Sequence, residues 1–241
     1  MLTAESLYSK PMVTIHQLEE PVRLINVVRD DLLVGGTKEA ALVSVLMHLD
    51  GEEFVYAGPR YGYAQIALAV ACRRINRRAT LFMADSKELH PRSIIAAQHG
   101  AKIVRVPNGY LTTVQCRARE YCRKTGATML PFGLDCEAMK IAISERALSL
   151  NMNPAQVWSV AGSGLLQRGL QMAWPHAQFY AVRIGKETRA GRATVMTAPE
   201  KYEQPAKELP PFPSCDNYDA KAWQFIVRHA GNMSLFWNVG G

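Results

Sequence analysis

The stretch VWSVAGSGLLQRGLQMA, residues 157–173, joins an apolar strand to a helix through the turn Gly162-Ser163-Gly164. At such a turn, successive backbone N–H groups and the dipole of the following helix attract an anion. Glycine also lets a ligand approach the backbone without a Cβ in the way. The turn matches neither GxGxxG nor a Walker P-loop. It therefore predicts either a tight turn without a ligand or a phosphate cradle formed by Gly162, Ser163, Gly164 and Leu165.

Strands and helices alternate on both sides of this turn. Short runs rich in β-branched and aromatic residues predict strands, and longer amphipathic runs between them predict helices. This order is typical of a parallel sheet wound by helices, so the sequence predicts a three-layer αβα fold of the α/β class. Residues 186–217 are rich in Lys, Glu, Pro and Thr and are expected to form a long loop or cover segment. The expected strands are 22–28, 53–57, 79–83, 102–106, 156–160, 178–182 and 234–237, and the expected helices are 39–49, 63–75, 91–99, 111–124, 165–173 and 220–229.

Length and composition are those of a globular protein. The chain has 241 residues, of which 48% are hydrophobic and 20% charged, enough for a sizeable core. No apolar run approaches a membrane span, and residues 1–17 lack the apolar stretch of a signal peptide. Zinc and disulfide frameworks are both disfavoured, because the five cysteines are scattered and form no CxxC pair. We therefore expect no metal site, no membrane partner and a cytoplasmic location.

The net charge of +7 leaves two interpretations open. Much of the excess lies in two clusters, one at residues 73–78 and one at residues 117–124. Such clusters usually form solvated helix faces. They also suit a polyanionic partner such as DNA, although no nucleic-acid-binding motif is present.

Lys38 ends the segment Gly35-Gly36-Thr37-Lys38 at the start of an expected helix. The helix dipole disfavours a positive charge at that end, and two glycines would let a planar ring come close. A desolvated lysine has a lowered pKa and can act as a nucleophilic amine, as a Schiff base with an aldehyde cofactor requires. The alternative is an exposed lysine in the first helical turn.

Several motifs, in one order along nearly the whole chain, resemble the pyridoxal-phosphate (PLP) enzymes of the β-family, fold type II. The similar branch is that of 1-aminocyclopropane-1-carboxylate deaminase and D-cysteine desulfhydrase. Its lysine motif, K-R-[DE]-D-L followed by G-G-N-K, resembles residues 29–38. The other resembling segments are Ala57-Gly58 with the Ala-rich run after Tyr63, the loop and helix 160–170, Tyr218-Asp219-Ala220-Lys221, and the closing FWNVGG at 236–241.

The resemblance implies a fold, a cofactor and roles for named residues. The cofactor would be PLP, bound covalently by Lys38, with its phosphate on Gly162, Ser163, Gly164 and Leu165. The chain would act at Cα of an amino-acid substrate by deamination, elimination, replacement or decarboxylation, as a homodimer. Lys38, Tyr63 and Tyr218 would be catalytic, Asn238 would contact the cofactor, and Arg60, Tyr61, Gly62 and Tyr63 would contact the substrate. Packing is the alternative role for each tyrosine.

The sequence also departs from the family pattern. The expected substrate loop reads Pro59-Arg60-Tyr61-Gly62-Tyr63 and lacks the asparagine that usually meets the ring oxygen of the cofactor. Val239 stands where a threonine is expected near the pyridine nitrogen. The chain is shorter than members of this branch, so we expect one PLP-enzyme unit over 1–241 with a reduced small subdomain at about 53–130. Residues 1–52 and 131–241 would form the large, cofactor-binding subdomain.

Three functions remain open from the sequence. The first is a PLP enzyme for a small free amino acid. The second is a PLP enzyme for an amino-acid adduct on thymidine in bacteriophage DNA, which would act in the host cytoplasm. The third is a binding module that has this fold and no catalysis.

Overall fold

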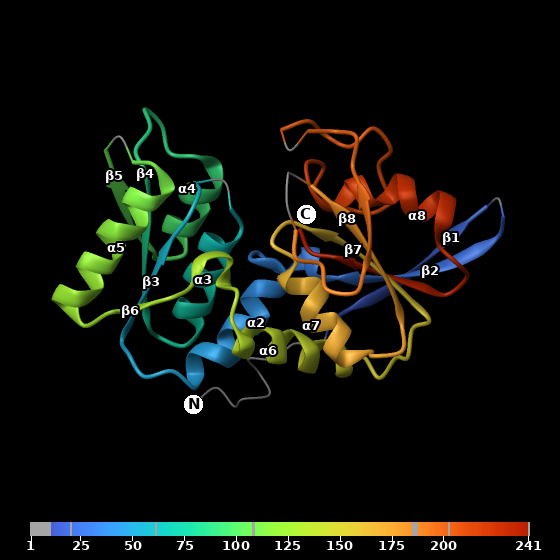
Figure 1. The fold of residues 1–241 in the computed structure, drawn as a ribbon, viewed down its shortest axis with the longest axis horizontal. Coiled ribbons are helices and arrows are strands. Elements are labelled where there is room, and N and C mark those ends of the chain that lie inside the picture. Colours follow the sequence, from blue (N-terminus) through green and yellow to red (C-terminus); the bar gives the residue numbers. More distant parts are fainter. Residues whose placement is uncertain are drawn as a thin grey trace. The chain divides into compact units, whose positions relative to one another are not determined.

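The computed structural model describes residues 11–19, 21–60, 62–107, 109–184, 188–201 and 203–240. Among these, the chain divides into two compact units (Figure 1). Unit 1 contains residues 34–136, and unit 2 contains residues 11–33 together with 137–240. Among the described residues, no helix has the length and apolar character that crossing a membrane requires.

Unit 1 is built on a parallel four-stranded sheet in the order β5-β4-β3-β6. Helix α5 packs on one face, where its Val114 and Ala118 form a core with residues of β3, β4 and β5. Helix α3 contacts β3 and β4 as well as α2 and α4. The elements in chain order are α2 (Gly36–Met47), β3 (Glu53–Ala57), α3 (Ala64–Arg74), β4 (Arg78–Ala84), α4 (Pro91–Gln98), β5 (Lys102–Val106), α5 (Leu111–Thr125), β6 (Thr128–Met129) and the 3-10 turn η2 (Phe132–Leu134).

Unit 2 is built on a six-stranded sheet in the order β1-β2-β10-β7-β8-β9. All neighbouring pairs are parallel except β1 with β2, so the edge strand β1 is antiparallel. Strand β10 lies between the early strand β2 and the later strand β7. The elements are β1 (Val13–Leu18), β2 (Arg23–Arg29), η1 (Asp30–Leu32), α6 (Glu137–Leu148), β7 (Gln156–Ala161), α7 (Leu165–Ala173), β8 (Gln178–Arg183), β9 (Thr194–Thr197), η3 (Asp219–Ala222), α8 (Trp223–His229) and β10 (Ser234–Asn238).

The two faces of this sheet have different cores. On one face, Trp158 of β7 and Phe236 of β10 pack with Trp223 and Ile226 from the last helical segment. Helices α6 and α7 pack together, and Gln167 of α7 donates to Ser159 Oγ of β7 at 2.8 Å. Because side chains of a strand alternate between faces, Ser159 and Trp158 necessarily serve opposite cores.

A buried ion pair ties three elements of unit 2 together. Asp30 of η1 is fully buried and accepts from Arg146 of α6, with the shortest N···O distance at 2.5 Å. The same carboxylate accepts from Trp237 Nε1 of β10 at 3.1 Å. A buried carboxylate needs such partners, because an unpaired charge in the interior is costly. Asp30, in the segment Arg29-Asp30-Asp31, therefore has a structural role: it holds η1, α6 and β10 together.

The expected alternation of strands and helices is confirmed, and the differences are local. Four of the helices and strands were not predicted: the edge strand β1, the two-residue strand β6, helix α6, and strand β9, which lies inside the expected cover segment. The compact unit that contains β3 to β6 spans residues 34–136 and includes α2, which packs on α3. The extent of a reduced small subdomain stays a prediction.

Candidate functional site

Lys38 lies in the first turn of α2, and part of its side chain remains exposed. Burial lowers the pKa of Lys38 from 10.5 to about 8, and the nearby carboxylate of Asp135 opposes that shift. About a tenth of the amine is thus neutral at pH 7, far more than for an ordinary lysine. Asp135 follows the carboxyl end of β6, and sequence analysis did not identify it. The arrangement provides a nucleophilic amine with an acidic group beside it.

The backbone before Lys38 is fixed by Glu39, which is fully buried. Glu39 Oε2 accepts from the N–H of Gly35 at 2.8 Å, and Glu39 Oε1 pairs with Arg74 Nη2 of α3 at 2.6 Å. Gly35 allows this close packing, since a Cβ there would lie 2.6 Å from the Cα of Ala67. The glycines before Lys38 therefore bring α2 against α3 and hold the lysine in place.

The expected substrate loop leaves the carboxyl end of β3. Arg60 is exposed, Gly62 closes a turn onto Pro59 O at 3.1 Å, and Tyr63 precedes α3. The Tyr63 ring stacks against the guanidinium of Arg92, 4.1 Å from the ring centroid. Tyr61 lies outside the described residues. Three of the four expected substrate residues are thus placed on one loop of unit 1.

The glycine turn of unit 2 forms a strand–turn–helix junction, as expected. Gly164 has φ of +81° and begins α7 as its N-cap, and a Cβ on it would lie 2.2 Å from Arg189 O. Leu165 N–H approaches Ser163 Oγ at 3.4 Å. Within the described part of the chain, the backbone N–H groups of Ser163 and Gly164 donate to no protein atom. Two unused donors at a helix start make an anion cradle.

A hydroxyl lies in the segment that packs on this cradle. The backbone N–H of Arg189 donates to Ser163 O at 3.4 Å, and Thr188 is its neighbour in the chain. Thr188 Oγ1 is buried and has no hydrogen-bond partner among the residues that are described. Buried hydroxyls normally have partners, so this one is a candidate ligand donor. Sequence analysis placed Thr188 in a cover segment and did not identify it.

Two further expected site residues also belong to unit 2. The Tyr218 hydroxyl oxygen lies 2.9 Å from the position that a Cβ on Gly162 would occupy, so the two residues are in direct contact. Asn238 is fully buried at the end of β10. Its amide donates to Pro213 O at 2.8 Å, and its oxygen accepts from Ser214 Oγ at 2.7 Å. The Asn238 side chain thus holds the cover segment through one donated and one accepted hydrogen bond.

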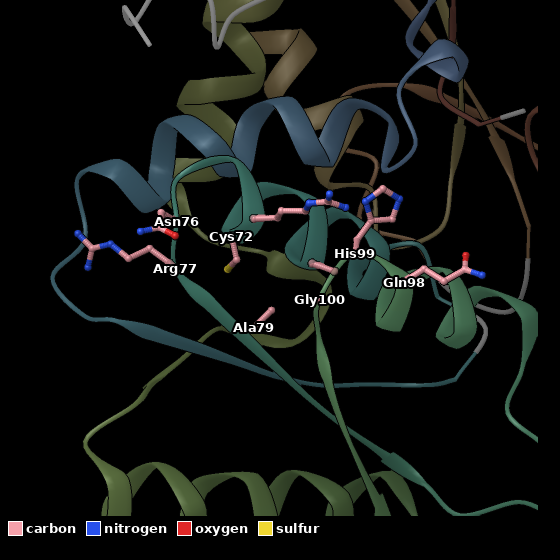
Figure 2. Close-up of a pocket in the computed structure, with 9 residues that line it drawn as sticks. Cys72, Asn76, Arg77, Ala79, Gln98, His99 and Gly100 are labelled. Atoms are coloured by element: carbon pink, nitrogen blue, oxygen red, sulfur yellow. The ribbon is translucent and has the colours of Figure 1, made fainter. Parts of the chain in front are cut away.

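A pocket of about 320 Å³ lies elsewhere in unit 1 (Figure 2). Figure 2 shows Asn76 and Arg77 on one side of it and Gln98 and His99 on the other. These residues precede β4 and β5, so the pocket lies at the amino edge of the parallel sheet. Ligands of open α/β sheets bind at the carboxyl edge. Lys38 does not line this pocket, and we do not assign the chemistry to it.

Comparisons with known proteins identify the fold. No protein-family model matches the sequence, and no curated protein matches it. Among solved structures, an ACC deaminase homologue is similar with a TM-score of 0.78 and 14% identity, over 97% of this chain and 90% of that one. O-ureido-L-serine synthase gives 0.72 and 15%, over 96% and 89%. Diaminopropionate ammonia lyase from Escherichia coli gives 0.68 and 14%, over 97% and 83%. The expected fold, type II of the PLP-dependent enzymes, is thereby confirmed.

Proposed function

We propose that this chain is a PLP-dependent enzyme that acts at Cα of an amino-acid substrate, with Lys38 as the residue that binds the cofactor. The observation that carries the proposal is the position of Lys38 in the first turn of α2, directly after a glycine backbone held by the buried Glu39, where burial lowers its pKa to about 8. Only a neutral amine attacks an aldehyde, and an ordinary lysine is almost wholly protonated at neutral pH.

The residues of unit 2 fit the phosphate of such a cofactor. The unused N–H groups of Ser163 and Gly164, at the start of α7, suit the oxygens of a dianion. Ser163 and Thr188 add hydroxyl groups in the same neighbourhood. A side chain at position 164 would collide with Arg189 O, which explains glycine at that place. We propose Gly162, Ser163, Gly164 and Leu165 as the phosphate loop.

PLP supplies an electron sink for a bond broken at Cα of an amino acid. Lys38 Nζ is the group that we expect to take and return the Cα proton. Its pKa near 8 lets it act as base and as acid within about one pH unit of neutrality. Asp135 keeps part of the population protonated, because its carboxylate raises the Lys38 pKa against the effect of burial.

Deamination, elimination, replacement and decarboxylation all begin with binding of a substrate amine. The similar structures include a deaminase homologue, a synthase and an ammonia lyase, and at this identity they support no single reaction. Product analysis with free serine, D-cysteine and 1-aminocyclopropane-1-carboxylate would distinguish the candidates. We also propose that the protein forms a homodimer. Light scattering after gel filtration measures its oligomeric state.

The decisive experiment is spectroscopic. The purified protein mixed with PLP should show a visible absorbance band of bound cofactor, and borohydride should fix the cofactor on the peptide that contains Lys38. Lys38→Ala should lose both signals. Lys124→Ala, which changes an exposed lysine at the end of α5, should keep both. An unchanged band in Lys38→Ala would disprove the proposal.

A second candidate substrate is an amino-acid adduct on DNA. It is supported by the exposed face of α5, which carries Arg119, Arg123 and Lys124. Binding of duplex DNA that weakens steeply with salt, without turnover of free amino acids, would favour this candidate. A protein that shows no cofactor band and no turnover would instead be a binding module.

A further inference from the structure

Three basic side chains gather at the carboxyl edge of the unit 1 sheet. Arg60 follows β3, while His90 and Arg92 follow β4 at the start of α4. Strands β3 and β4 are parallel neighbours, so the segments that follow them leave the sheet at the same edge. We call Arg60, His90 and Arg92 the edge cluster.

Hydrogen bonds fix the substrate loop against α4. Ser93 Oγ of α4, which is fully buried, donates toward Arg60 O and Gln65 Oε1, at 3.1 Å from each. Gln65 Nε2 of α3 donates to the same Arg60 O at 2.5 Å. The Arg92 guanidinium of α4 lies over the ring of Tyr63, 4.1 Å from the ring centroid. These hydrogen bonds hold the backbone of Arg60 against α4, while its side chain is exposed and His90 and Arg92 are half-buried.

The positive charge of the edge cluster comes from the two arginines, because the lowered pKa of His90 keeps its ring neutral at neutral pH. His90 Nδ1 accepts from the backbone N–H of Arg92 at 3.2 Å, so the ring carries its proton on Nε2. Burial lowers the pKa of His90, and the charges of Arg92 and Arg60 lower it further. The Arg60 backbone contacts Ser93, the residue after Arg92, at 3.1 Å. Arg60 forms no ion pair with any described residue. Asp85, the acidic residue directly after β4, is paired with Arg105 at 2.6 Å.

The edge cluster lies within reach of a substrate bound at Lys38. Gly35 packs on Ala67, Lys38 is one helical turn beyond Gly35, and Tyr63 is one turn before Ala67. With a rise of about 5 Å per turn, the Cα atoms of Lys38 and Tyr63 are at most roughly 15 Å apart. Arg60 lies three residues before Tyr63 on the same loop, and both Lys38 and Arg60 have long side chains.

We propose that the edge cluster binds a second anionic group of the substrate, a phosphoryl or carboxylate group distinct from the α-carboxylate. This inference deepens the proposed function and rests on it. Arginine suits the task, because its planar fork donates two parallel hydrogen bonds to such a group. The substrate class would be amino acids with an acidic side chain, phosphorylated or carboxylated, or an amino acid next to a nucleic-acid phosphate.

The pocket in Figure 2 is a weaker candidate for an anion, although Arg73 and Arg77 line it. It lies at the C-terminal ends of α3 and α4, where the helix dipoles disfavour negative charge. Arg77 is also occupied, since it donates to the carbonyl of Gly51 and pairs with Glu52 at 3.1 Å. Arg73 therefore offers a matched control: an exposed arginine of unit 1 at the opposite edge of the sheet.

Calorimetric titration of the PLP-loaded protein with O-phospho-L-serine and with L-serine tests the inference. We expect phosphoserine to bind at least about tenfold more tightly, as a charge-assisted hydrogen bond predicts. Arg60→Gln and Arg92→Gln should each lose about tenfold in affinity for phosphoserine and clearly less in affinity for serine. Arg73→Gln should leave both affinities unchanged. Arg60→Lys, which keeps the charge but not the fork, should recover part of the loss. Circular dichroism verifies the fold of each variant.

The outcomes separate the two proposals. If the cofactor band is present but phosphoserine and serine bind alike, or Arg60→Gln and Arg73→Gln behave alike, the inference is overturned and the proposed function stands. If the band is absent, the proposed function fails, and the same titrations on the unloaded protein still decide whether the edge cluster binds the phosphoryl group. Competition by a DNA oligonucleotide, lost in Arg60→Gln, would show that the phosphate belongs to nucleic acid.

Discussion

Gly164 and Gly126 both have backbone angles that disfavour a side chain, with φ of +81° and +76°. They differ in surroundings: a Cβ at 164 would meet Arg189 O at 2.2 Å, whereas a Cβ at 126 would meet nothing within 4 Å. We expect Gly126→Ala to cost about 1–2 kcal/mol of unfolding free energy from backbone strain alone. Gly164→Ala should cost about 1–3 kcal/mol more, because the segment around Arg189 must shift. Urea unfolding measures the loss of unfolding free energy in each variant. Equal losses would contradict the close contact between residue 164 and Arg189.

Lys38 should reveal its lowered pKa by its reactivity. In the cofactor-free protein, acylation of Lys38 should rise with pH and reach half its maximum near pH 8, because the neutral fraction grows as pH passes the pKa. A lysine in an unfolded peptide should reach that point near pH 10.5, the ordinary value. Mass spectrometry of the labelled peptide measures the profile. A Lys38 profile that coincides with that of the peptide would refute the effect of burial.

Single residues show what the sequence predicts and what it leaves out. Lys38 and the glycine turn were predictable, because glycines before a lysine and between a strand and a helix have a local physical meaning. His90 and Arg92 were not identified as site residues. Their proposed role depends on β3 and β4 being neighbouring strands of the sheet, and no local sequence pattern indicates that pairing. The assignment of roles to Lys38, Tyr63, Tyr218 and Asn238 stays a prediction.

At the scale of elements, the joint between η1, α6 and β10 depends on the Asp30 carboxylate. Asp30→Ala should lower the unfolding free energy by about 3–5 kcal/mol, because Arg146 would remain buried without its partner. Glu208→Ala removes the partner of Arg228 from an exposed pair and should cost less than about 1 kcal/mol. Chemical denaturation of both variants measures the contrast. A small loss of unfolding free energy in Asp30→Ala would mean that solvent reaches the pair of Asp30 and Arg146.

The elements that sequence analysis did not predict share a physical cause. Helix α6 buries mainly small or polar residues besides Met139 and Ile143, so its apolar stripe contrasts weakly with the rest. Strand β9 is largely exposed at the sheet edge and lies in a Pro-rich segment. Strand β1 is likewise an edge strand, with Ile15 60% exposed. The central strands were predictable because burial on both faces gives them continuous apolar runs.

At the scale of the whole molecule, the two units differ in continuity. The described core of unit 1 is one uninterrupted segment, 34–136, with its own sheet and core. We expect a fragment of residues 34–136 to fold alone and to unfold cooperatively in urea, as measured by circular dichroism. A fragment of residues 137–241 should not fold alone, because it lacks β2 and Asp30. The first expectation fails if the 34–136 fragment gives a random-coil spectrum.

The position of β10 has a consequence for biosynthesis. In the sheet of unit 2, β10 separates β2 from β7, yet it is the last strand of that sheet to be translated. The nascent chain thus carries two unjoined half-sheets, β1–β2 and β7–β9, until its final strand leaves the ribosome. The strands of the unit 1 sheet, β3 to β6, are all translated before β7, so this sheet does not depend on a late strand. A premature stop codon just before Ser234 would therefore leave the inner edges of β2 and β7 exposed to aggregation.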